Sequence, residues 1–364
     1  MTTTHLKYGL IGCGMMGREH LRNIALLDDC EVTTIFEPDA AMRKAASEIT
    51  PNAKFVDSID AVINSSAVDA LVITSPNHLH LQQIEQIAAA GAKPLLVEKP
   101  LYTSPDDAKR VQHLQDTYAA PIWVAMEYRY MPAITDFLQT VETATGGIKM
   151  LTIREHRFPF LEKVGNWNRF NHNSGGTLVE KCCHFFDLMR LVMGSEVVRV
   201  MASAGQSVNH LTESYEGRVP DIWDNGYVIL DFENGTRAML ELCMFAEGSR
   251  YQEKISAIGP AGMIEANVPG PGRFWRDAAG PPPVAELTIS PRATQIPVTS
   301  PVTVDPLLLA AGDHNGATFY QHQKFAAVAR GNGAPEVTLA DGAKAVAIGL
   351  AAQESAATGC AVAL

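Results

Sequence analysis

The sequence predicts an α/β protein with a doubly wound parallel sheet in its N-terminal part and a large, mostly antiparallel sheet in the remainder. Two observations lead to this fold class. Up to Met126, short apolar runs alternate with helical stretches, whereas the later candidate strands are longer and two of them are joined by a tight turn. With 364 residues the chain is too long for one ordinary domain. We expect two domains, over residues 1–127 and 128–364.

The N-terminal alternation begins with an apolar run, Tyr8–Ile11, which is followed by glycines and a helical stretch from Arg18. Short continuous apolar strands that alternate with helices are typical of parallel βαβ units buried on both faces. The further expected strands are Val32–Phe36, Ala70–Thr74, Leu95–Val97 and Ile122–Met126, and the expected helices are Ala40–Ile49, His80–Ala90 and Pro105–Tyr118.

The second half has longer candidate strands, at Lys149–Arg157, Val197–Gln206, Gly226–Phe232, Arg237–Phe245 and Tyr251–Ile258. Between two of them, Glu233–Thr236 contains Asn-Gly, which supplies the positive φ values of a hairpin turn and therefore favours antiparallel pairing. One helix, Thr177–Met193, ended by Gly194, is expected to cover this sheet. Pro269–Pro283 is expected to be a loop. Two helices, Gly316–Arg330 and Leu339–Glu354, are expected to follow.

Composition limits the classes of function. The formal net charge of −11 argues against nucleic acid or an anionic membrane surface as the main partner. No apolar run reaches the ~18 residues of a membrane helix, and the N-terminus leads into a strand without a signal-peptide pattern. The six cysteines are scattered, and Cys182 and Cys183 are adjacent, which suits neither a disulfide framework nor a zinc site. We therefore expect a cytoplasmic protein without a bound metal.

A G-x-G-x-x-G motif directly follows the first strand and opens the first helix; it consists of Gly12, Cys13, Gly14, Met15, Met16 and Gly17. The glycines allow a tight turn and a close approach of the backbone to a pyrophosphate, which the positive end of the helix dipole attracts. The next strand ends at Glu37, whose carboxylate is placed to accept hydrogen bonds from the adenosine ribose and to repel a 2′-phosphate. The sequence therefore predicts a dinucleotide site that prefers NAD to NADP.

Three further segments carry candidate active-site residues. Ser75-Pro76-Asn77 and His80 follow the strand Ala70–Thr74, and Glu98-Lys99-Pro100 follows the next strand, so both segments reach the sheet edge that receives a nicotinamide. Ser174-Gly175-Gly176-Thr177 then opens a helix that carries Glu180, His184 and Asp187 on one face. In this order the segments resemble the glucose–fructose oxidoreductase and inositol dehydrogenase family of nicotinamide-dependent enzymes, over nearly the whole chain.

The resemblance implies a Rossmann domain, followed by an α/β domain whose open antiparallel sheet often builds a homotetramer or a dimer. It makes Lys99 a catalytic and substrate-orienting residue and His184 the active-site histidine, while Glu180 stands where aspartate is common in the family. Tyr128 is a further substrate-binding candidate. The other cofactor-binding candidates are Ser75, Pro76, Asn77, His80, Glu98 and Trp167.

These residue types fit the oxidation of an alcohol, in which nicotinamide C4 accepts a hydride and the protein accepts a proton. We assign the proton to His184 and the orientation and polarisation of the oxygen to Lys99, with the reverse assignment as the alternative. Glu180 has two interpretations. It is either an active-site carboxylate or, with Thr177, part of a capping box at the helix N-terminus.

The expected function is NAD-dependent oxidation of a hydroxyl carbon of a sugar or inositol. The first rival is an NAD-dependent glycosidase that oxidises its sugar transiently and returns the hydride, and the second is a catalytically silent NAD-binding regulator. The expected partner is a small sugar, polyol or glycoside. A basic group, Arg154, His156, Arg157 and Arg169, either binds an acidic sugar or forms a solvated strand face, and Asp313-His314-Asn315-Gly316 is a helix entry that could border the cleft.

Overall fold

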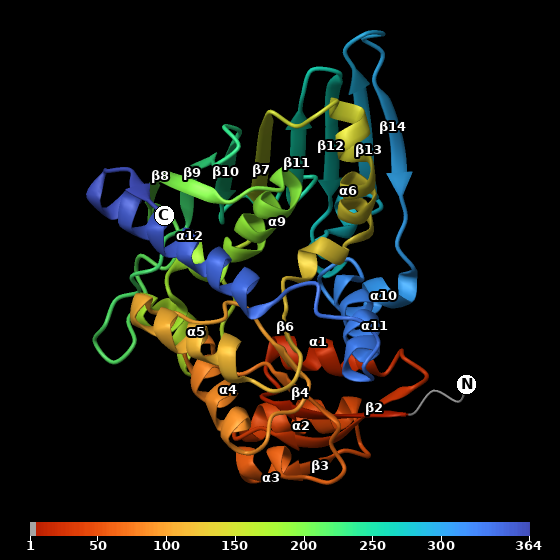
Figure 1. Cartoon of the computed structure of the whole chain (residues 1–364), viewed down its shortest axis with the longest axis vertical. Helices are drawn as coiled ribbons and strands as arrows, with labels where there is room; N and C mark the ends of the chain where they lie inside the picture. The colour runs from red at the N-terminus through yellow and green to blue at the C-terminus, as the bar shows by residue number, and fades with distance from the viewer. Residues whose placement is uncertain (1–4) are drawn as a thin grey trace.

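The computed structural model describes residues 5–364, so the first four residues of the predicted N-terminal domain lie outside it. Two sheets occupy opposite ends of the long axis of the molecule, with helices between them and along their faces (Figure 1). The lower sheet is parallel and the upper one is mixed. The predicted fold class is confirmed.

The lower sheet has six parallel strands within residues 5–364, in the order β3-β2-β1-β4-β5-β6. This order reverses direction between β1 and β4, as a doubly wound sheet does at the point where a dinucleotide binds. Its strands are β1 (Leu6–Ile11), β2 (Cys30–Phe36), β3 (Lys54–Val56), β4 (Ala70–Ile73), β5 (Leu95–Val97) and β6 (Ile122–Val124). The connecting helices are α1 (Met15–Ile24), α2 (Ala40–Ile49), α3 (Ile59–Ile63), α4 (His80–Ala89) and α5 (Ala108–Thr117).

The upper sheet has nine strands in the described part of the chain, in the order β14-β13-β12-β11-β7-β10-β9-β8-β15. Its neighbours pair antiparallel except for β7 and β10, which are parallel. The turn between β9 and β10 contains Asn234-Gly235 as predicted, with Gly235 at φ +77°. The strands are β7 (Met150–His156), β8 (Val197–Gly205), β9 (Asn225–Phe232), β10 (Arg237–Cys243), β11 (Glu253–Ile258), β12 (Gly262–Val268), β13 (Ala285–Pro291), β14 (Val298–Val302) and β15 (Val362–Ala363).

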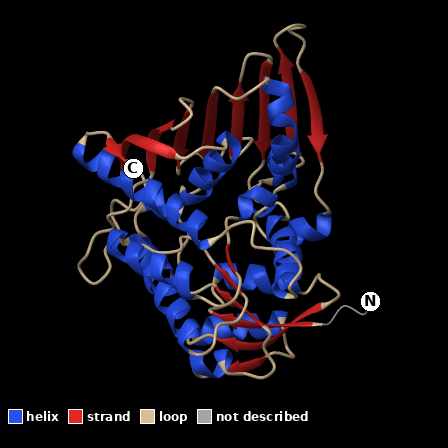
Figure 2. Cartoon of the chain, viewed as in Figure 1, coloured by secondary structure: helices blue, strands red, loops and turns tan. Residues whose placement is uncertain are grey.

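Helices cover one face of the upper sheet, as Figure 2 shows. They include α6 (Pro132–Thr145), α9 (Cys183–Met193) and α12 (Leu339–Thr358), whereas the sequence predicted a single covering helix. The predicted continuous helix Thr177–Met193 is wrong, because α8 (Thr177–Glu180) and α9 are separated by a turn at Lys181-Cys182. The remaining helices are α7 (Asn171–Ser174), α10 (Pro306–Ala311) and α11 (Ala317–Ala329).

The last long helix, α12, connects the two sheets, and α11 packs on the N-terminal domain. The helix α11 contacts α1, and α12 contacts both β6 of the lower sheet and β8 of the upper sheet. Just before α12, the carbonyl of Val337 accepts a hydrogen bond from the Val124 amide. The C-terminal segment therefore fixes the two sheets against each other. The domain boundary after residue 127 stays a prediction.

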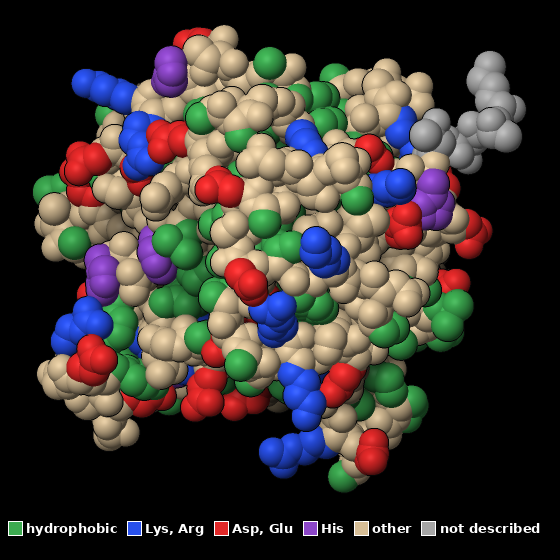
Figure 3. All heavy atoms as spheres, turned by 90° about the horizontal axis from the view of Figure 1, so that it is seen from below, with side chains coloured by type: hydrophobic (Ala, Val, Ile, Leu, Met, Phe, Trp, Pro, Cys, Tyr) green, Lys and Arg blue, Asp and Glu red, His purple; other side chains and the backbone are tan. Residues whose placement is uncertain are grey.

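The surface carries charges of both signs. Seen from below the parallel sheet (Figure 3), Lys and Arg side chains are interspersed with Asp and Glu. Across residues 5–364, no helix is long and apolar enough to cross a membrane.

Candidate active site

A small cavity of about 90 Å³ lies where the carboxyl edge of the parallel sheet meets the upper sheet. Lys99 reaches it from the end of β5, and Tyr128 reaches it from the segment after β6. Glu180 and His184 reach it from α8 and α9. The structure therefore brings together all four residues predicted to bind substrate, from three separate segments. The other charged lining residues are Glu19, Glu127, Arg157, Lys163, Lys181, Glu253, Asp313 and His314.

The glycine loop beside this cavity has the geometry that a pyrophosphate requires. Gly12 has φ +92°, and a Cβ on Gly17 would lie 2.6 Å from the Gly12 carbonyl oxygen, so both positions require glycine. Gly14 is the N-cap of α1 and offers no side chain to the free N–H groups of the first turn. A Cβ on Gly14 would have open space around it, so a ligand can approach the backbone here. These residues fit a bound dinucleotide.

Glu37 is buried beside the same loop. Its carboxylate accepts hydrogen bonds from the Cys13 amide, at 2.5 Å, and from the Asp39 amide, at 2.9 Å. These bonds fix the carboxylate next to the second residue of the motif. This is the neighbourhood in which the sequence placed the adenosine ribose.

The segment after β4 is held by buried hydrogen bonds. His80 is fully buried, and its two ring nitrogens lie 2.9 Å from the carbonyl oxygens of Ser75 and Pro100. His80 therefore positions the Ser75-Pro76-Asn77 segment from beneath. The Trp167 ring centroid lies 6.2 Å from the His78 ring centroid, so the tryptophan stands next to this segment.

Glu98 belongs to a buried chain of hydrogen bonds. Its Oε1 lies 2.8 Å from His20 Nε2, and its Oε2 accepts a bond from the Lys99 amide. His20 in turn lies 2.7 Å from His322 Nε2 on α11. Because an ionised carboxylate only accepts, His20 donates to Glu98 through Nε2, and this chain of hydrogen bonds holds the residue that precedes Lys99.

Lys99 and His184 both reach the cavity, Lys99 with an ammonium that donates hydrogen bonds and His184 with a ring nitrogen that can accept a proton. Lys99 Nζ donates to the Glu180 carbonyl at 3.0 Å. The His184 ring stacks on Tyr128 with a centroid distance of 4.1 Å, and its Nδ1 has no hydrogen-bond partner among residues 5–364. Burial, together with the positive charges of Lys99 and Lys181, holds the pKa of His184 well below its usual range. The imidazole is therefore neutral near pH 7 and able to accept a proton.

The predicted capping box at Glu180 is wrong. Gly176, with φ +88°, is the N-cap of α8, so Thr177 already lies inside the helix and donates its hydroxyl to the Trp223 carbonyl. The Glu180 carboxylate faces the cavity, where its Oε1 lies 3.8 Å from Lys163 Nζ. Asp187, predicted on the same helix face, is instead bound by Arg129 outside the cavity.

A buried ionic cluster that no sequence motif predicted lies next to Tyr128. Lys181 Nζ donates to the Tyr128 hydroxyl and lies 2.9 Å from Glu155 on β7. Glu253 on β11 pairs directly opposite Glu155. Burial and the charge of Glu155 raise the pKa of Glu253 to about 7. A glutamate within a predicted strand, such as Glu155, was the signal that the sequence offered. The strand register is needed to show that the carboxylates of Glu155 and Glu253 lie opposite each other.

His314 was left undecided by the sequence, and the structure places it in the cavity. Its Nδ1 lies 2.7 Å from Glu19 on α1 and 3.4 Å from Glu127, which follows β6. Burial alone would lower the pKa of His314, but the two carboxylates raise it to about 9. The three side chains have ligand atoms within 4.8 Å of one another. Burial raises the pKa of Glu127, and the His314 imidazolium compensates the charge of Glu19.

The predicted basic group does not assemble. Arg154 donates to the Tyr251 carbonyl, His156 pairs with Glu241 and Arg169 pairs with Glu213. Of the four, Arg157 lines the cavity. The basic group therefore forms separate ion pairs and hydrogen bonds and not one anion site.

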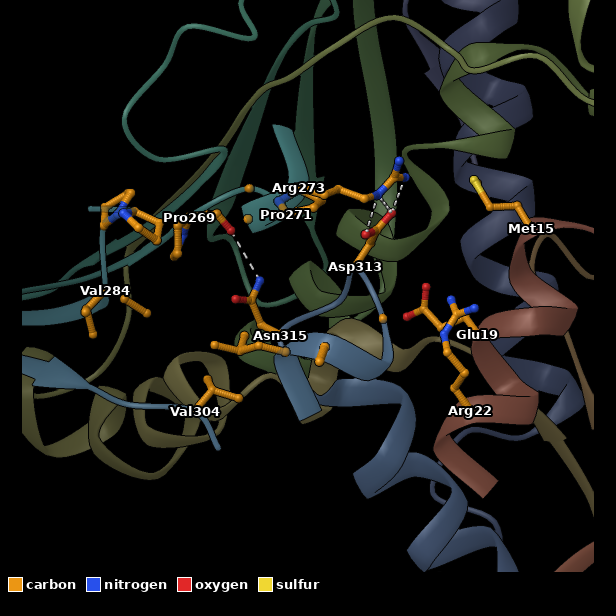
Figure 4. Close-up of a pocket in the computed structure, with 18 of the residues that line it drawn as sticks. Met15, Glu19, Arg22, Pro269, Pro271, Arg273, Val284, Val304, Asp313 and Asn315 are labelled. Atoms are coloured by element: carbon orange, nitrogen blue, oxygen red, sulfur yellow. Dashed lines mark hydrogen bonds and ion pairs between the residues drawn. The ribbon is translucent and has the colours of Figure 1, made fainter. Parts of the chain in front are cut away.

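A larger groove of about 920 Å³ adjoins the cavity (Figure 4). On one side lie Met15, Glu19 and Arg22 of α1, and on the other lies the Pro269–Pro283 loop, in which Arg273 forms an ion pair with Asp313. The groove and the cavity share Met15, Glu19, Leu161, Pro271 and Asp313, so the two spaces are continuous.

The fold and this site define an NAD-binding oxidoreductase. Two family models match most of the chain: "Oxidoreductase family, NAD-binding Rossmann fold" over residues 6–126 and "Oxidoreductase family, C-terminal alpha/beta domain" over residues 144–364. The chain belongs to this GFO/IDH/MocA oxidoreductase family, as its motifs predicted, and it is an NAD-dependent enzyme.

Named relatives support this assignment. The chain is 28% identical to inositol 2-dehydrogenase of Corynebacterium glutamicum over 274 residues, which cover 75% of this chain and 77% of that protein. It is 23% identical over 276 residues to the rhizopine catabolism protein MocA of Rhizobium meliloti, covering 75% and 80% of the two chains.

Solved structures share the fold. A myo-inositol dehydrogenase from Corynebacterium glutamicum has a TM-score of 0.75 at 22% identity and covers 99% of this chain and 98% of its own. Levoglucosan dehydrogenase in complex with NADH and levoglucosan has a TM-score of 0.79 at 22% identity, with coverage of 98% and 99%.

Proposed function

We propose that this enzyme oxidises a hydroxyl carbon of a sugar or an inositol, with Lys99, His184 and Glu180 as its catalytic residues. The observation that carries the proposal is the convergence of Lys99 and His184 on one cavity next to the uncapped N-terminus of α1. When bound, NAD supplies the hydride acceptor. The relatives named as inositol dehydrogenases and the structure containing levoglucosan support a polyhydroxyl substrate.

The protein's own part in this chemistry is to hold the hydroxyl and to remove its proton. We assign the proton to His184, because burial keeps the ring neutral and its stacking on Tyr128 fixes its plane. Lys99 Nζ donates one hydrogen bond to the Glu180 carbonyl, and its other two N–H groups are available to orient and polarise the substrate oxygen. Glu180, buried next to Lys163, contributes a carboxylate that accepts a hydrogen bond from a neighbouring hydroxyl of the substrate.

A second candidate function is a glycosidase that oxidises its sugar transiently and returns the hydride. The adjoining groove favours this possibility, because it offers space for a second substituent directly outside the cavity. A panel of free sugars, inositols and glycosides incubated with NAD⁺ separates the two functions. A dehydrogenase accumulates NADH with a free sugar or inositol, whereas the glycosidase cleaves a glycoside with no net NADH. Absence of both reactions with every member of the panel would count against both functions.

We also propose that the chain forms a homodimer or a homotetramer through the open face of the upper sheet. Exposed apolar side chains lie on its strands, including Met150 on β7, Tyr227 and Ile229 on β9 and Ile258 on β11. The six cysteines are unpaired, as is usual in a reducing compartment, and on this basis we propose a cytoplasmic location. Light scattering of the purified enzyme measures the oligomeric state.

A further inference from the structure

We propose that His314 is a substrate-binding residue that donates a hydrogen bond to a hydroxyl oxygen of an uncharged polyol, and that the cavity it lines disfavours sugar acids. The proposal rests on the proposed function and specifies its substrate class. His314 comes from the loop between α10 and α11, yet it lines the same cavity as Lys99 and His184. Both histidine rings contact Tyr128, His184 at a centroid distance of 4.1 Å and His314 at 5.9 Å.

One edge of the His314 ring is fully engaged. Its Nδ1 lies between Glu19 Oε1 and Glu127 Oε1, and both glutamates are buried. The Thr318 hydroxyl, four residues further along the chain, lies 3.1 Å from Glu19 Oε1 and 2.5 Å from Glu127 Oε2, and its single proton is donated to one of the two carboxyl groups at a time. The opposite ring edge carries Nε2, for which no partner is found among residues 5–364. The His314 side chain retains 18% exposure, and the cavity is the space that this edge can face.

The charge of His314 determines what this edge can bind. Glu127 and Glu19 outweigh the effect of burial and raise the pKa of His314 to about 9, so both ring nitrogens carry a proton near pH 7. Nδ1–H is donated to Glu19, and Nε2–H remains for a substrate oxygen. The other titratable groups near this ring are Lys181 and the neutral His184 from the α8–α9 segment and Glu98 from the end of β5.

At the free edge of His314 a sugar acid would find no uncompensated cation. Lys99, for which no carboxylate partner is found among residues 5–364, donates to the Glu180 carbonyl and is assigned to the reacting hydroxyl. The His314 imidazolium is paired with Glu19, and burial raises the pKa of Glu127, so a sugar carboxylate at the free edge would find no uncompensated positive charge and would lose its hydration. A neutral hydroxyl can accept the same N–H bond without that cost. The other cations of the cavity also have carboxylate neighbours: Lys181 lies 2.9 Å and Arg157 3.7 Å from Glu155, and Lys163 lies 3.8 Å from Glu180.

The test compares three variants with the wild-type holoenzyme. His314→Gln removes the charged donor. The double variant Glu19→Gln/His314→Gln also removes one of the two buried carboxylates that the single change leaves facing each other. His156→Gln is the matched control, because His156 forms a similar pair with Glu241, at 2.7 Å, outside the cavity. The probes are D-glucose with D-glucuronate, D-galactose with D-galacturonate, and myo-inositol, each assayed by NADH formation.

We expect the wild type to prefer the neutral member of a pair by about 100-fold or more in kcat/KM. His314→Gln should raise KM for the best neutral probe by about tenfold or more, with kcat within about threefold. The double variant should recover the wild-type melting temperature but keep the raised KM, and His156→Gln should leave KM unchanged.

An unchanged KM in both His314 variants, a preference for the uronate, or loss of activity on EDTA treatment would each overturn this role of His314. The last outcome would show that the three side chains hold a metal. If the wild type forms no NADH with any probe, the proposed function itself fails and the role of His314 falls with it. NADH formation with an unchanged KM in the variants refutes only the role of His314.

Discussion

Replacing Glu180 with glutamine separates stability from activity at the active site. The Glu180 side chain is 5% exposed, and its Oε2 has no hydrogen-bond partner in the described part of the chain. Its Oε1 lies 3.8 Å from Lys163, beyond hydrogen-bond distance. A carboxylate held in this way contributes little to folding, so its presence is better explained by catalysis.

The expected magnitudes follow from these contacts. An unsatisfied buried polar group costs about 1–3 kcal/mol of stability, and the loss of the weak pair with Lys163 acts in the opposite direction. We therefore expect Glu180→Gln to leave the free energy of unfolding within about 1 kcal/mol of wild type, or to raise it. Turnover should fall about 100-fold, the usual effect of losing a positioned acid–base group. The acid limb of the pH–rate profile should move to lower pH, because the His184 imidazolium loses a stabilising anion.

Urea unfolding and steady-state NADH formation across pH measure both effects. Glu142→Gln is the control, because it makes the same Glu-to-Gln change at an exposed position of α6. Turnover within about threefold of wild type, together with an unchanged pH profile, would refute a catalytic role for Glu180. A fall of several kcal/mol in the free energy of unfolding of Glu180→Gln would refute the claim that the buried carboxylate does not stabilise the fold.

Three other predictions concern the cofactor site, the reacting groups and His314. Because Glu37 lies fixed beside Cys13, NAD should bind at least about tenfold more tightly than NADP, or about 1.4 kcal/mol; equal affinities by calorimetry would contradict this role. Lys99→Ala and His184→Ala should each lower turnover by about 100-fold or more while NAD affinity and melting temperature change little. Near-normal turnover would exclude that residue from the chemistry. The pKa of His314 is about 9 in the folded protein and 6.5 when unfolded, so this residue stabilises the fold fully below about pH 6.5 and loses that contribution as the pH rises through about 9. The loss is on the order of 3 kcal/mol. It should appear in urea unfolding at several pH values and be absent from Glu19→Gln/His314→Gln, and an identical pH dependence of the two proteins would be the contrary result.

The alternation of apolar runs with helical stretches was enough to predict the parallel sheet, because its strands are buried on both faces and read as continuous apolar segments. Every predicted strand is present to within two residues at each end. The helix α6 was missed although Pro132 in its first turn and Gly146 at its C-cap are ordinary helix signals. The strands β12 and β13 flank the Pro/Gly-rich loop, and no strand after Ile258 was predicted from the sequence.

The sequence predicted the site residues that lie in local motifs, and it did not predict those that only tertiary packing brings into the site. The glycine loop, Lys99 and His184 lie in recognisable segments. Glu19, Glu127 and His314 come from α1, the segment after β6 and the loop before α11, and only the packing of α11 on α1 brings them together. Thr177-x-x-Glu180 matches a capping box in sequence, but the chain enters α8 through two glycines with positive φ, which shifts the N-cap to Gly176.

The most direct test of the central claim follows the hydrogen of the reacting carbon. The best substrate of the sugar and polyol panel, deuterated at its hydroxyl-bearing carbons, is incubated with the enzyme and NAD⁺, and cofactor and sugar are analysed by mass spectrometry. We predict one deuterium in the reduced cofactor for each ketone formed, and loss of this transfer in His184→Ala. Deuterium that returns to a cleaved sugar would establish the hydride-returning glycosidase, and a reduced cofactor without deuterium would contradict oxidation at a hydroxyl carbon.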